Sequence, residues 1–178
     1  MRVIETPAFT LEPQTVAHAE EMFRVLSDPA IYEYENAPPP SLEWLRARFE
    51  RLESRRSRDG REQWLNWVIR LPTSELIGYV QATVDGGQRA TIAYVLASAH
   101  WGRGLARRAV EVMIEELEAQ HGARRLAAVL KRDNQRSQRL LERLGFAPAS
   151  EHELATTAIA ADERLMVRDL VDPRATTL

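Results

Sequence analysis

Two glycines, Gly102 and Gly104, stand between a mostly apolar run and a helix-like run that begins near Leu105. A strand, a tight turn and a helix start together form an anion site, because the first amides of a helix have no intrahelical partner and the helix dipole is positive there. Glycine lets the main chain approach a ligand, since it carries no Cβ. Arg103 and Arg107 add positive charge beside the turn. The segment therefore predicts a site for a phosphate or another anion.

Such a turn is by itself structural more often than not, so the surrounding sequence must decide. The Walker loop ends in Gly-Lys-Ser/Thr, and the dinucleotide loop requires a third glycine and an acidic residue about 20 positions later. Here the turn reads Gly-Arg-Gly-Leu-Ala-Arg-Arg over residues 102–108, without a lysine and without a third glycine. Both of these phosphate-binding loops are therefore excluded.

A second polar pair lies downstream, where Asn134 and Ser137 precede the run Leu-Leu-Glu-Arg-Leu-Gly-Phe at residues 140–146. Taken alone, Asn134 is as readily a helix N-cap, and Ser137 is more simply a hydroxyl on an exposed helix. Two ordered motifs at a fixed separation carry more weight than either motif alone.

Together the two segments resemble the GNAT acetyltransferase superfamily. Gly104 and Ala106 match the last two positions of its acetyl-CoA loop, Gln/Arg-x-x-Gly-x-Gly/Ala. Trp101 stands where Gln or Arg is usual, and this departure is similar to the branch of Rim-type (RimJ/RimL-like) ribosomal-protein N-terminal acetyltransferases. The run at 134–146 resembles the Asn-x-x-Ser and Glu-Lys-Leu-Gly-Phe segment of the same branch. The resemblance is close over residues 74–148 and holds only in outline elsewhere.

The resemblance implies the GNAT fold, which is a mixed α/β (α+β) domain. Its central sheet has about six to seven mostly antiparallel strands with one parallel, splayed pair, and about four helices flank it. The residue pattern agrees, because a strand at 90–97, a helix at 104–120 ending at Gly122 and an apolar strand at 125–130 form one crossover unit. We expect a single domain over residues 1–178.

The remaining elements follow from hydrophobic periodicity and turn residues. In chain order we expect a strand at 9–11, a helix at 15–26, a proline-rich loop at 31–40, a helix from the N-cap Ser41 to Arg51, strands at 63–70 and 75–84, a helix at 134–144, a strand opening at Phe146 and a last strand at 163–170.

The resemblance further implies acetyl-CoA as the acetyl donor. Its pantetheine arm is expected between the splayed strands, bonded to the main chain of Val95 and Ala97, and its pyrophosphate on the amides of residues 102–107. The donor-binding residues so implied are Val95, Leu96, Ala97, Gly102, Arg103, Gly104, Leu105, Ala106, Arg107 and Asn134.

Acetyl transfer by direct attack in a ternary complex needs an uncharged amine, a stabilised oxyanion and a proton for the leaving thiolate. Many GNAT members use a tyrosine for that proton, but Leu141 occupies its place here. The Rim-type branch points instead to Ser137 as the catalytic acid, with Asn134 orienting the acid or the cofactor arm. A family position that often carries a glutamate base holds Thr91, so an ordered water is the expected base.

The acceptor implied is a primary amine, either a protein N-terminus or a small molecule such as an aminoglycoside, a polyamine or an amino acid. In relatives the segment near residue 33 covers the acceptor cleft. For Trp64 and Trp67, packing in the protein core is a simpler explanation than contact with the acceptor. The residues expected to contact the acceptor are Tyr32, Glu33, Tyr34, Trp64 and Trp67, with Glu35 beside them.

Composition sets outer bounds on function. The 178 residues contain no cysteine and carry a net charge of −2, which excludes a thiol nucleophile and argues against a nucleic-acid or anionic-membrane surface. No spacing indicates a metal site, and no apolar run suits a membrane span or a secretory signal. We therefore expect a cytoplasmic monomer or homodimer without metal. A non-catalytic acyl-CoA-binding regulator stays open, because the tyrosine is missing and the base is unclear.

Overall fold

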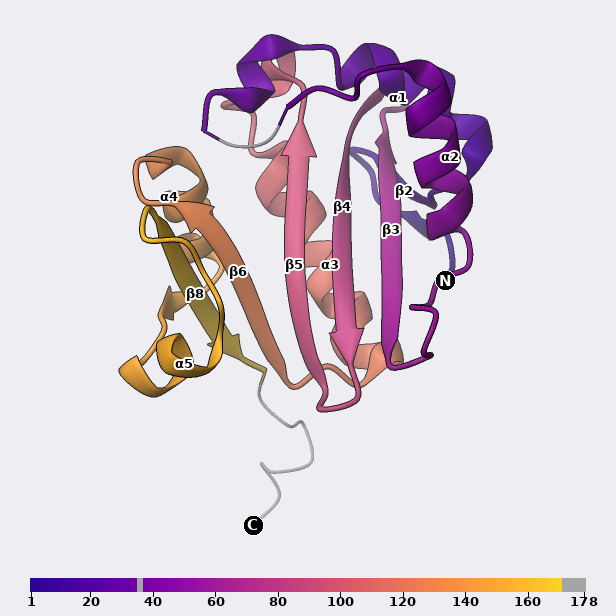
Figure 1. Ribbon diagram of the computed structural model, residues 1–178. Helices are drawn as coiled ribbons and strands as arrows, with labels where there is room; N and C mark the ends of the chain where they lie inside the picture. Colours follow the sequence, from indigo (N-terminus) through magenta and orange to yellow (C-terminus); the bar gives the residue numbers. More distant parts are fainter. Residues whose placement is uncertain (35–36, 171–178) are drawn as a thin grey trace.

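The computed structural model describes residues 1–34 and 37–170 (Figure 1). The strands of these residues form one eight-stranded sheet in the order β1-β2-β3-β4-β5-β6-β8-β7. The strands are β1 (Ile4–Glu5), β2 (Thr10–Pro13), β3 (Glu62–Arg70), β4 (Leu76–Asp85), β5 (Arg89–Leu96), β6 (Arg125–Lys131), β7 (Ala147–Pro148) and β8 (Glu163–Asp169). The helices are α1 (Ala19–Val25), α2 (Leu42–Leu52), α3 (Leu105–His121), α4 (Gln135–Arg143) and α5 (Glu151–Thr156), with short 3₁₀ turns η1 (Val16–His18), η2 (Pro29–Tyr32) and η3 (Ser98–His100).

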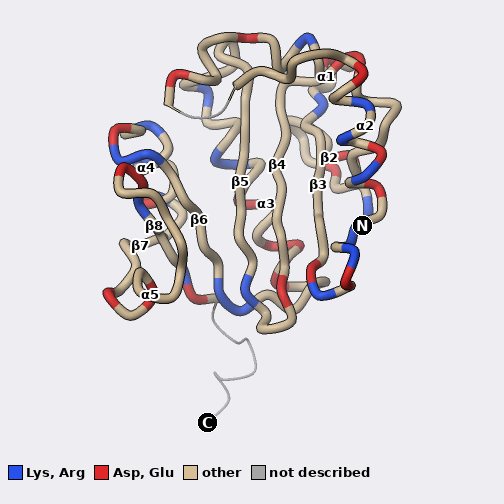
Figure 2. Tube along the Cα trace, viewed as in Figure 1, with Lys and Arg blue, Asp and Glu red and all other residues tan. Residues whose placement is uncertain are grey.

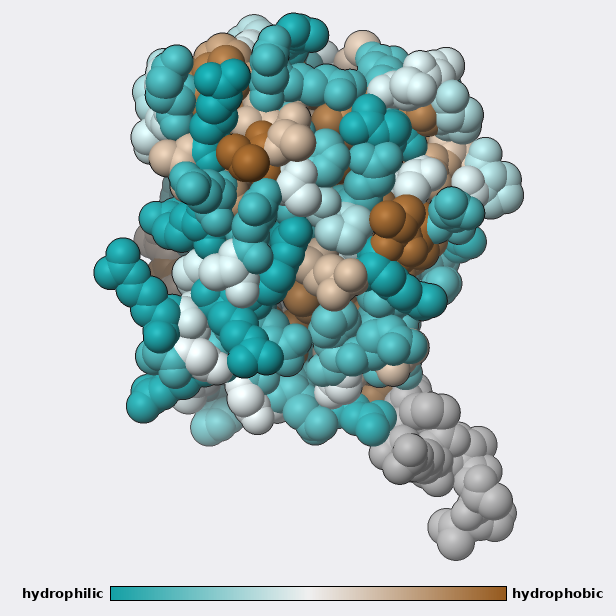
Figure 3. Space-filling model, turned by 90° about the vertical axis from the view of Figure 1, so that its right-hand side faces the viewer, coloured by the Kyte–Doolittle hydropathy of each residue, from teal (hydrophilic) through white to brown (hydrophobic). Residues whose placement is uncertain are grey.

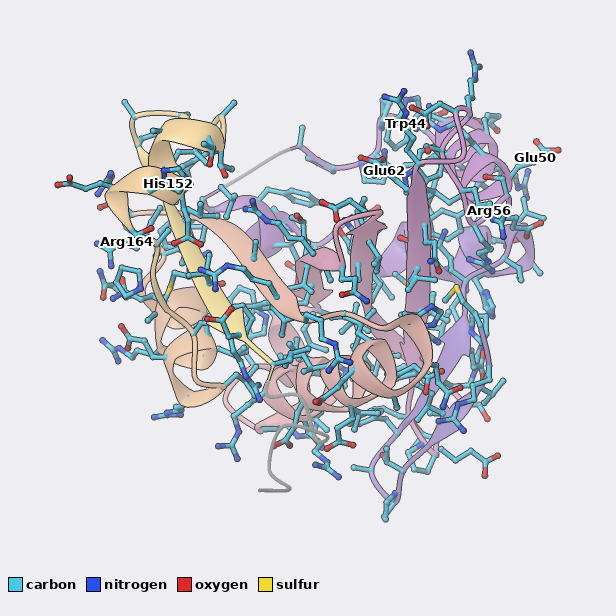
Figure 4. The ribbon with its side chains drawn as sticks, turned by 90° about the horizontal axis from the view of Figure 1, so that it is seen from below. Trp44, Glu50, Arg56, Glu62, His152 and Arg164 are labelled. Carbon is cyan, nitrogen blue, oxygen red and sulfur yellow. The ribbon has the colours of Figure 1, made fainter. Side chains whose placement is uncertain are left out.

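Helices cover both faces of the sheet. α3 and α4 lie on one face, while α1, α2 and α5 lie on the other (Figure 1, Figure 4). The apolar stripe of α3 packs into the main core, which also holds Trp67 of β3 and Leu141 of α4. A second core joins α1 and α2 to the opposite face through Val68 and Leu76. Burial on both faces explains why the central strands are rich in apolar residues.

The expected GNAT fold is confirmed, with one mixed, mostly antiparallel sheet and one parallel pair. The long elements lie within a few residues of their expected bounds. Among the described residues, however, there are eight strands and five α-helices instead of six to seven strands and four helices. The additional elements include β1, of two residues, and α5, of six, which are too short to produce a periodic hydrophobic signal.

The parallel strands β5 and β6 pair only at one end. Residues 89–91 pair with residues 125–127, and the described register continues no further. Each strand stays paired on its other side, β5 with β4 as far as Leu96 and β6 with β8 as far as Lys131. The two strands therefore diverge toward their carboxyl ends, and each leaves main-chain groups there without a strand partner (Figure 1).

Charged residues gather at the ends and edges of the sheet, whereas β5 is neutral beyond Arg89 (Figure 2). The side of the molecule that carries α1, α2 and the amino terminus is mostly hydrophilic, with hydrophobic residues in small separate patches (Figure 3). Within the described residues, no helix has the length and apolar character required to cross a membrane.

A half-buried ion pair between Arg125 and Glu153 holds α5 beside the paired end of β6. Glu153 Oε1 accepts a hydrogen bond from Arg125 Nε at 3.0 Å, and Glu153 Oε2 accepts from the main-chain N–H of Ser150, the N-cap of α5, at 2.9 Å. Arg125 and then Ser150 lower the pKa of Glu153 from 4.5 to about 2. The ionised carboxylate is therefore the form that the folded state favours.

This arrangement predicts a stability that depends on acid pH. Because the folded pKa lies below the unfolded one, the stabilisation is present above pH 4.5 and is lost as the pH falls toward 2. We expect Glu153→Gln to unfold at lower urea concentration than wild type at pH 7, and to lose that difference near pH 2. Glu151→Gln, an exposed position on the same turn, serves as the control. A pH-independent difference for Glu153→Gln would assign the effect to packing alone.

Candidate active site

The glycine turn forms an open main-chain cradle at the start of α3. Gly102 and Gly104 have φ values of 75° and 76°, in the left-handed region, and a Cβ built on either would meet no atom within 4 Å. Gly104 is the N-cap of α3, and Arg108 N donates to Gly104 O at 3.1 Å. The earlier amides of the first turn have no carbonyl four residues back within the helix. The cradle fits a phosphate or pyrophosphate group.

The side chain of Trp101 links this turn to the end of β5 through a hydrogen bond. Its Nε1 donates to Leu96 O at 2.8 Å, and the guanidinium of Arg136 lies over its ring, 3.7 Å from the ring centroid. Sequence reasoning missed Arg136. Arg136 lies in the first turn of α4, where a cation is unfavourable because the helix dipole is positive at that end. This unfavourable position was a signal in the sequence that could have marked Arg136 as functional. The contact brings positive charge from α4 to the anion cradle.

A cavity of about 420 Å³ occupies the opening between β5 and β6, and a second of about 140 Å³ adjoins it toward Trp101. The larger cavity extends to Trp44 and Arg48 of α2, and the smaller to Ala106 of α3. The residues that line both cavities are Ile31, Tyr34, Tyr94, Val95, Asn134 and Ser137. A path therefore runs from the anion cradle, between the splayed strands, to the face covered by α2.

A hydroxyl pair lies where the two cavities meet. Tyr94 Oη on β5 and Ser137 Oγ on α4 are 2.6 Å apart, and either oxygen can donate. Asn134 caps α4 and its Oδ1 accepts from Ser137 N at 3.0 Å. Sequence reasoning missed Tyr94, because within an apolar strand it reads as a core residue. Leu141, at the family's usual tyrosine position, is only 1% exposed and forms part of the wall.

The cap predicts a measurable stability role for Asn134. We expect Asn134→Ala to lower the free energy of unfolding by about 1 kcal/mol, because the N–H of Ser137 loses its acceptor. Asn134→Asp should retain most of the stability, since a carboxylate oxygen caps equally well. Urea denaturation measures both variants. Equal stability of Asn134→Ala and wild type would remove the capping role.

The register of β5 changes which of its main-chain groups can reach the expected acetyl-CoA. The groups that face the opening belong to residues one position away from the expected Val95 and Ala97. Ala97 N donates to Ile77 O at 2.8 Å, and Ala97 O accepts from His100 N at 3.0 Å, so both of these groups have partners. Main-chain groups of a strand alternate between its two neighbours. Val95 therefore faces β4, as Ala97 does, whereas Tyr94 and Leu96 face the opening toward β6. Leu96 O already accepts from Trp101 Nε1.

The two arginines expected beside the cradle, Arg103 and Arg107, lie on the protein surface. Arg103 and Arg107 are exposed, and Arg103 contacts the ring of buried His100 at 3.2 Å. Leu105 and Ala106 are half-buried in the first turn of α3. These side chains surround the cradle, whose main-chain amides lie at the start of α3.

The segment near residue 33 covers the larger cavity from outside. Tyr32 and Tyr34 line this cavity, and Tyr32 Oη donates to Leu26 O at 2.6 Å. Burial is the main factor that raises the pKa of Tyr32 to about 12, so its hydroxyl stays protonated. Glu33 is exposed and lines neither cavity, and Glu35 lies outside the described residues.

Asp28 attaches this covering segment to the turn after β5. Its Oδ2 accepts from Ser98 N at 2.8 Å and its Oδ1 from Ala30 N at 3.0 Å. The bond from Ser98 is the largest factor that lowers the pKa of Asp28. The sequence identified Asp28 only as part of a helix break, because its partner is 70 residues away.

Neither tryptophan expected near the acceptor, Trp64 or Trp67, lines either of the two cavities described above. Trp67 is fully buried and its Nε1 donates to Arg2 O at 3.1 Å, whereas Trp64 Nε1 donates to Glu62 Oε2 at 3.1 Å. Thr91, at the expected base position, ends the paired part of β5 and is exposed. In the part of the chain that the structure describes, no group of three or more His, Asp or Glu side chains could hold a metal ion.

A splayed parallel pair, a glycine turn at a helix start and a connecting cavity give the site the shape that an extended, phosphate-bearing substrate requires. The family model described as an acetyltransferase (GNAT) domain matches residues 9–147. The chain belongs to this family and is an acetyl-CoA-dependent acyltransferase.

Three known proteins illustrate the range of the similarity. The uncharacterised N-acetyltransferase YoaA of Bacillus subtilis is 26% identical over 147 residues, which cover 81% of this chain and 82% of the relative. RimL, a ribosomal L7/L12 α-N-protein acetyltransferase solved with coenzyme A, superposes with a TM-score of 0.77 at 15% identity, covering 95% and 98% of the two chains. The aminoglycoside acetyltransferase AAC(6′)-Ib, also solved with coenzyme A, gives 0.73 at 21% identity, covering 91% and 95%.

Proposed function

We propose that this protein is an N-acetyltransferase that transfers an acetyl group from acetyl-CoA to a primary amine by direct attack in a ternary complex. The observation that carries the proposal is the path from the anion cradle to the α2 face through the opening between β5 and β6. This path would let acetyl-CoA enter from one face of the sheet and the acceptor amine from the other. The family membership and the RimL-like and aminoglycoside-acetyltransferase folds of its neighbours support an amine acceptor.

The residues of the cradle would hold the donor. Amides at 102–107 would bind the pyrophosphate, with Arg103, Arg107 and Arg136 adding charge. Main-chain groups of Tyr94 and Leu96 would bind the pantetheine arm as an added strand does. Acetyl-CoA supplies the activated acetyl thioester.

At the junction of the cavities, Ser137 would act as the acid. As the acceptor nitrogen bonds to the acetyl carbon and the carbon–sulfur bond breaks, Ser137 Oγ gives its proton to the leaving sulfur. Tyr94 Oη, 2.6 Å away, can then return a proton to Ser137 and regain one from solvent. The proton released by the amine passes to water, as expected where the described lining residues carry no carboxylate or imidazole.

The test is an assay of thiol release from acetyl-CoA with a panel of amines: short peptides with free N-termini, amino acids, polyamines and aminoglycosides. We expect stoichiometric thiol release and acetylated product with at least one class. Calorimetric binding of acetyl-CoA without turnover on any class would instead favour the non-catalytic acyl-CoA-binding regulator. Absence of binding would overturn both functions.

We also propose that residues 1–178 act as one domain in the cytoplasm. The support for one domain is that all strands of the described residues join a single sheet. Gel filtration with light scattering distinguishes a monomer from a homodimer.

A further inference from the structure

The part of the larger cavity nearest α2 is lined mostly by aromatic and aliphatic residues, while Gln14 and Gln81 are among the polar residues that also line the cavity. Its walls come from α2, from the covering segment and from one face of β4 and β5. The side chains concerned include Tyr34, Trp44, Leu45, Phe49, Leu52 and Tyr79. Among the described residues that line this cavity, Arg48 is the single charged one.

Arg48 has no acidic partner within the described residues. It is half-buried, and its guanidinium carbon lies 5.7 Å from the centroid of the Trp44 ring. Figure 4 shows Trp44 on the side of α2, across the molecule from His152 of α5. By contrast, Arg46 on the same helix reaches Glu20 at 3.9 Å. A half-buried cation against apolar walls favours an anion from outside the chain.

Gln14 provides an independent observation in the same cavity. The residue is only 3% exposed, and its side-chain Nε2 is buried without a hydrogen-bond partner in the described structure. Its main chain is fixed, because Gln14 N donates to Asn66 O at 2.9 Å and Gln14 O accepts from Arg55. An unpaired buried donor has an energetic cost that a ligand oxygen would relieve. Arg48 therefore offers a charged donor to an acceptor-only group, and Gln14 adds an unpaired amide in the wall of the same cavity.

We infer that the acceptor is an amine that carries a carboxylate on an apolar body, which is the chemistry of a free hydrophobic or aromatic amino acid. The inference rests on the proposed N-acetyltransferase function and specifies its substrate class. Arg48 binds the carboxylate, the aromatic walls bind the side chain, and the amine lies toward the junction of the cavities. Polyamines and aminoglycosides are disfavoured, since they would bring further positive charge to Arg48.

The experiment compares matched acceptors that differ in one group: phenylalanine with phenylalaninamide, and leucine with leucinamide. We expect kcat/KM of the wild-type protein to favour the carboxylate of each pair roughly tenfold or more. The α-amine of the amide is less basic and therefore less protonated at neutral pH. If the enzyme did not recognise the carboxylate, the amide would therefore be acetylated faster than the acid. Arg48→Gln should abolish the preference, mainly by raising KM for the acids, and Arg48→Lys should retain part of it.

Arg51→Gln is the matched control, because Arg51 is exposed on the same helix and does not line the cavity. We expect it to keep the wild-type preference. The inference is overturned if the amides are acetylated as well as the acids, if neither member of either pair is acetylated while other amines are, or if Arg48→Gln lowers both members equally. These results leave the proposed function standing. Absence of thiol release with every amine overturns both.

Discussion

Gly104→Val is expected to weaken acetyl-CoA binding roughly a hundredfold, measured by calorimetry, which corresponds to about 2.7 kcal/mol. Two effects combine. Gly104 has a φ of 76°, where a branched side chain is strained, and its Cβ position opens onto the space in front of the first turn of α3. A valine there would occupy the volume in which main-chain amides meet the pyrophosphate.

Gly60→Val is the control that separates the two effects, because it introduces the same backbone strain without obstructing the proposed pyrophosphate site. Gly60 has a φ of 71°, its Cβ would also meet nothing within 4 Å, and it lies in the turn between α2 and β3, away from both cavities. We expect a comparable loss of stability but wild-type affinity for acetyl-CoA. Equal loss of affinity in the two variants, or full affinity of Gly104→Val, would show that the cradle does not hold the donor.

Ser137→Ala is expected to lower kcat by roughly 10²–10⁴-fold, the range typical of a positioned general acid. Affinity for acetyl-CoA should stay unchanged. The substitution removes only Oγ, because Asn134 caps α4 through the main-chain N–H of residue 137, which alanine retains. A fall in kcat therefore reports on chemistry and not on unfolding of the helix. Full kcat in the alanine variant would remove Ser137 from the mechanism.

Tyr94→Phe tests whether the hydroxyl pair acts as a unit. Phenylalanine keeps the ring packing of Tyr94 and removes the oxygen 2.6 Å from Ser137 Oγ. We expect a smaller loss of kcat than in Ser137→Ala, and no further loss when the two substitutions are combined. Additive losses in the double variant would mean that the two hydroxyls act independently.

Much of the fold could be predicted because its signals are local. The apolar run at 125–130, the helical stripe of α3 and the glycine turn each specify their own structure through periodicity or turn chemistry. The resemblance then supplied what periodicity does not give, namely which strands are parallel and splayed. Short elements such as β1 and α5 were missed, because two to six residues hold too few positions to show a period.

The site was predictable only in part, for a physical reason. Sequence patterns identify groups that act through the main chain near one position, as in the cradle at 102–107. Tyr94, Arg136 and Asp28 act through partners 43, 35 and 70 positions away, and nothing in the local pattern distinguishes them from core or surface residues. The direction of main-chain groups in β5 likewise depends on its register with β4.

The sequence by itself determined the order of the long elements, the glycine turn before α3 and, through its resemblance to a family, the class of the protein. Only the tertiary structure decided which hydroxyl faces Ser137, which strand groups face the opening, and that Arg48 and Gln14 line one cavity. Local propensity acts over a few residues, whereas a binding site is built where distant segments converge, and that convergence is set by the packing of helices on both faces of the sheet.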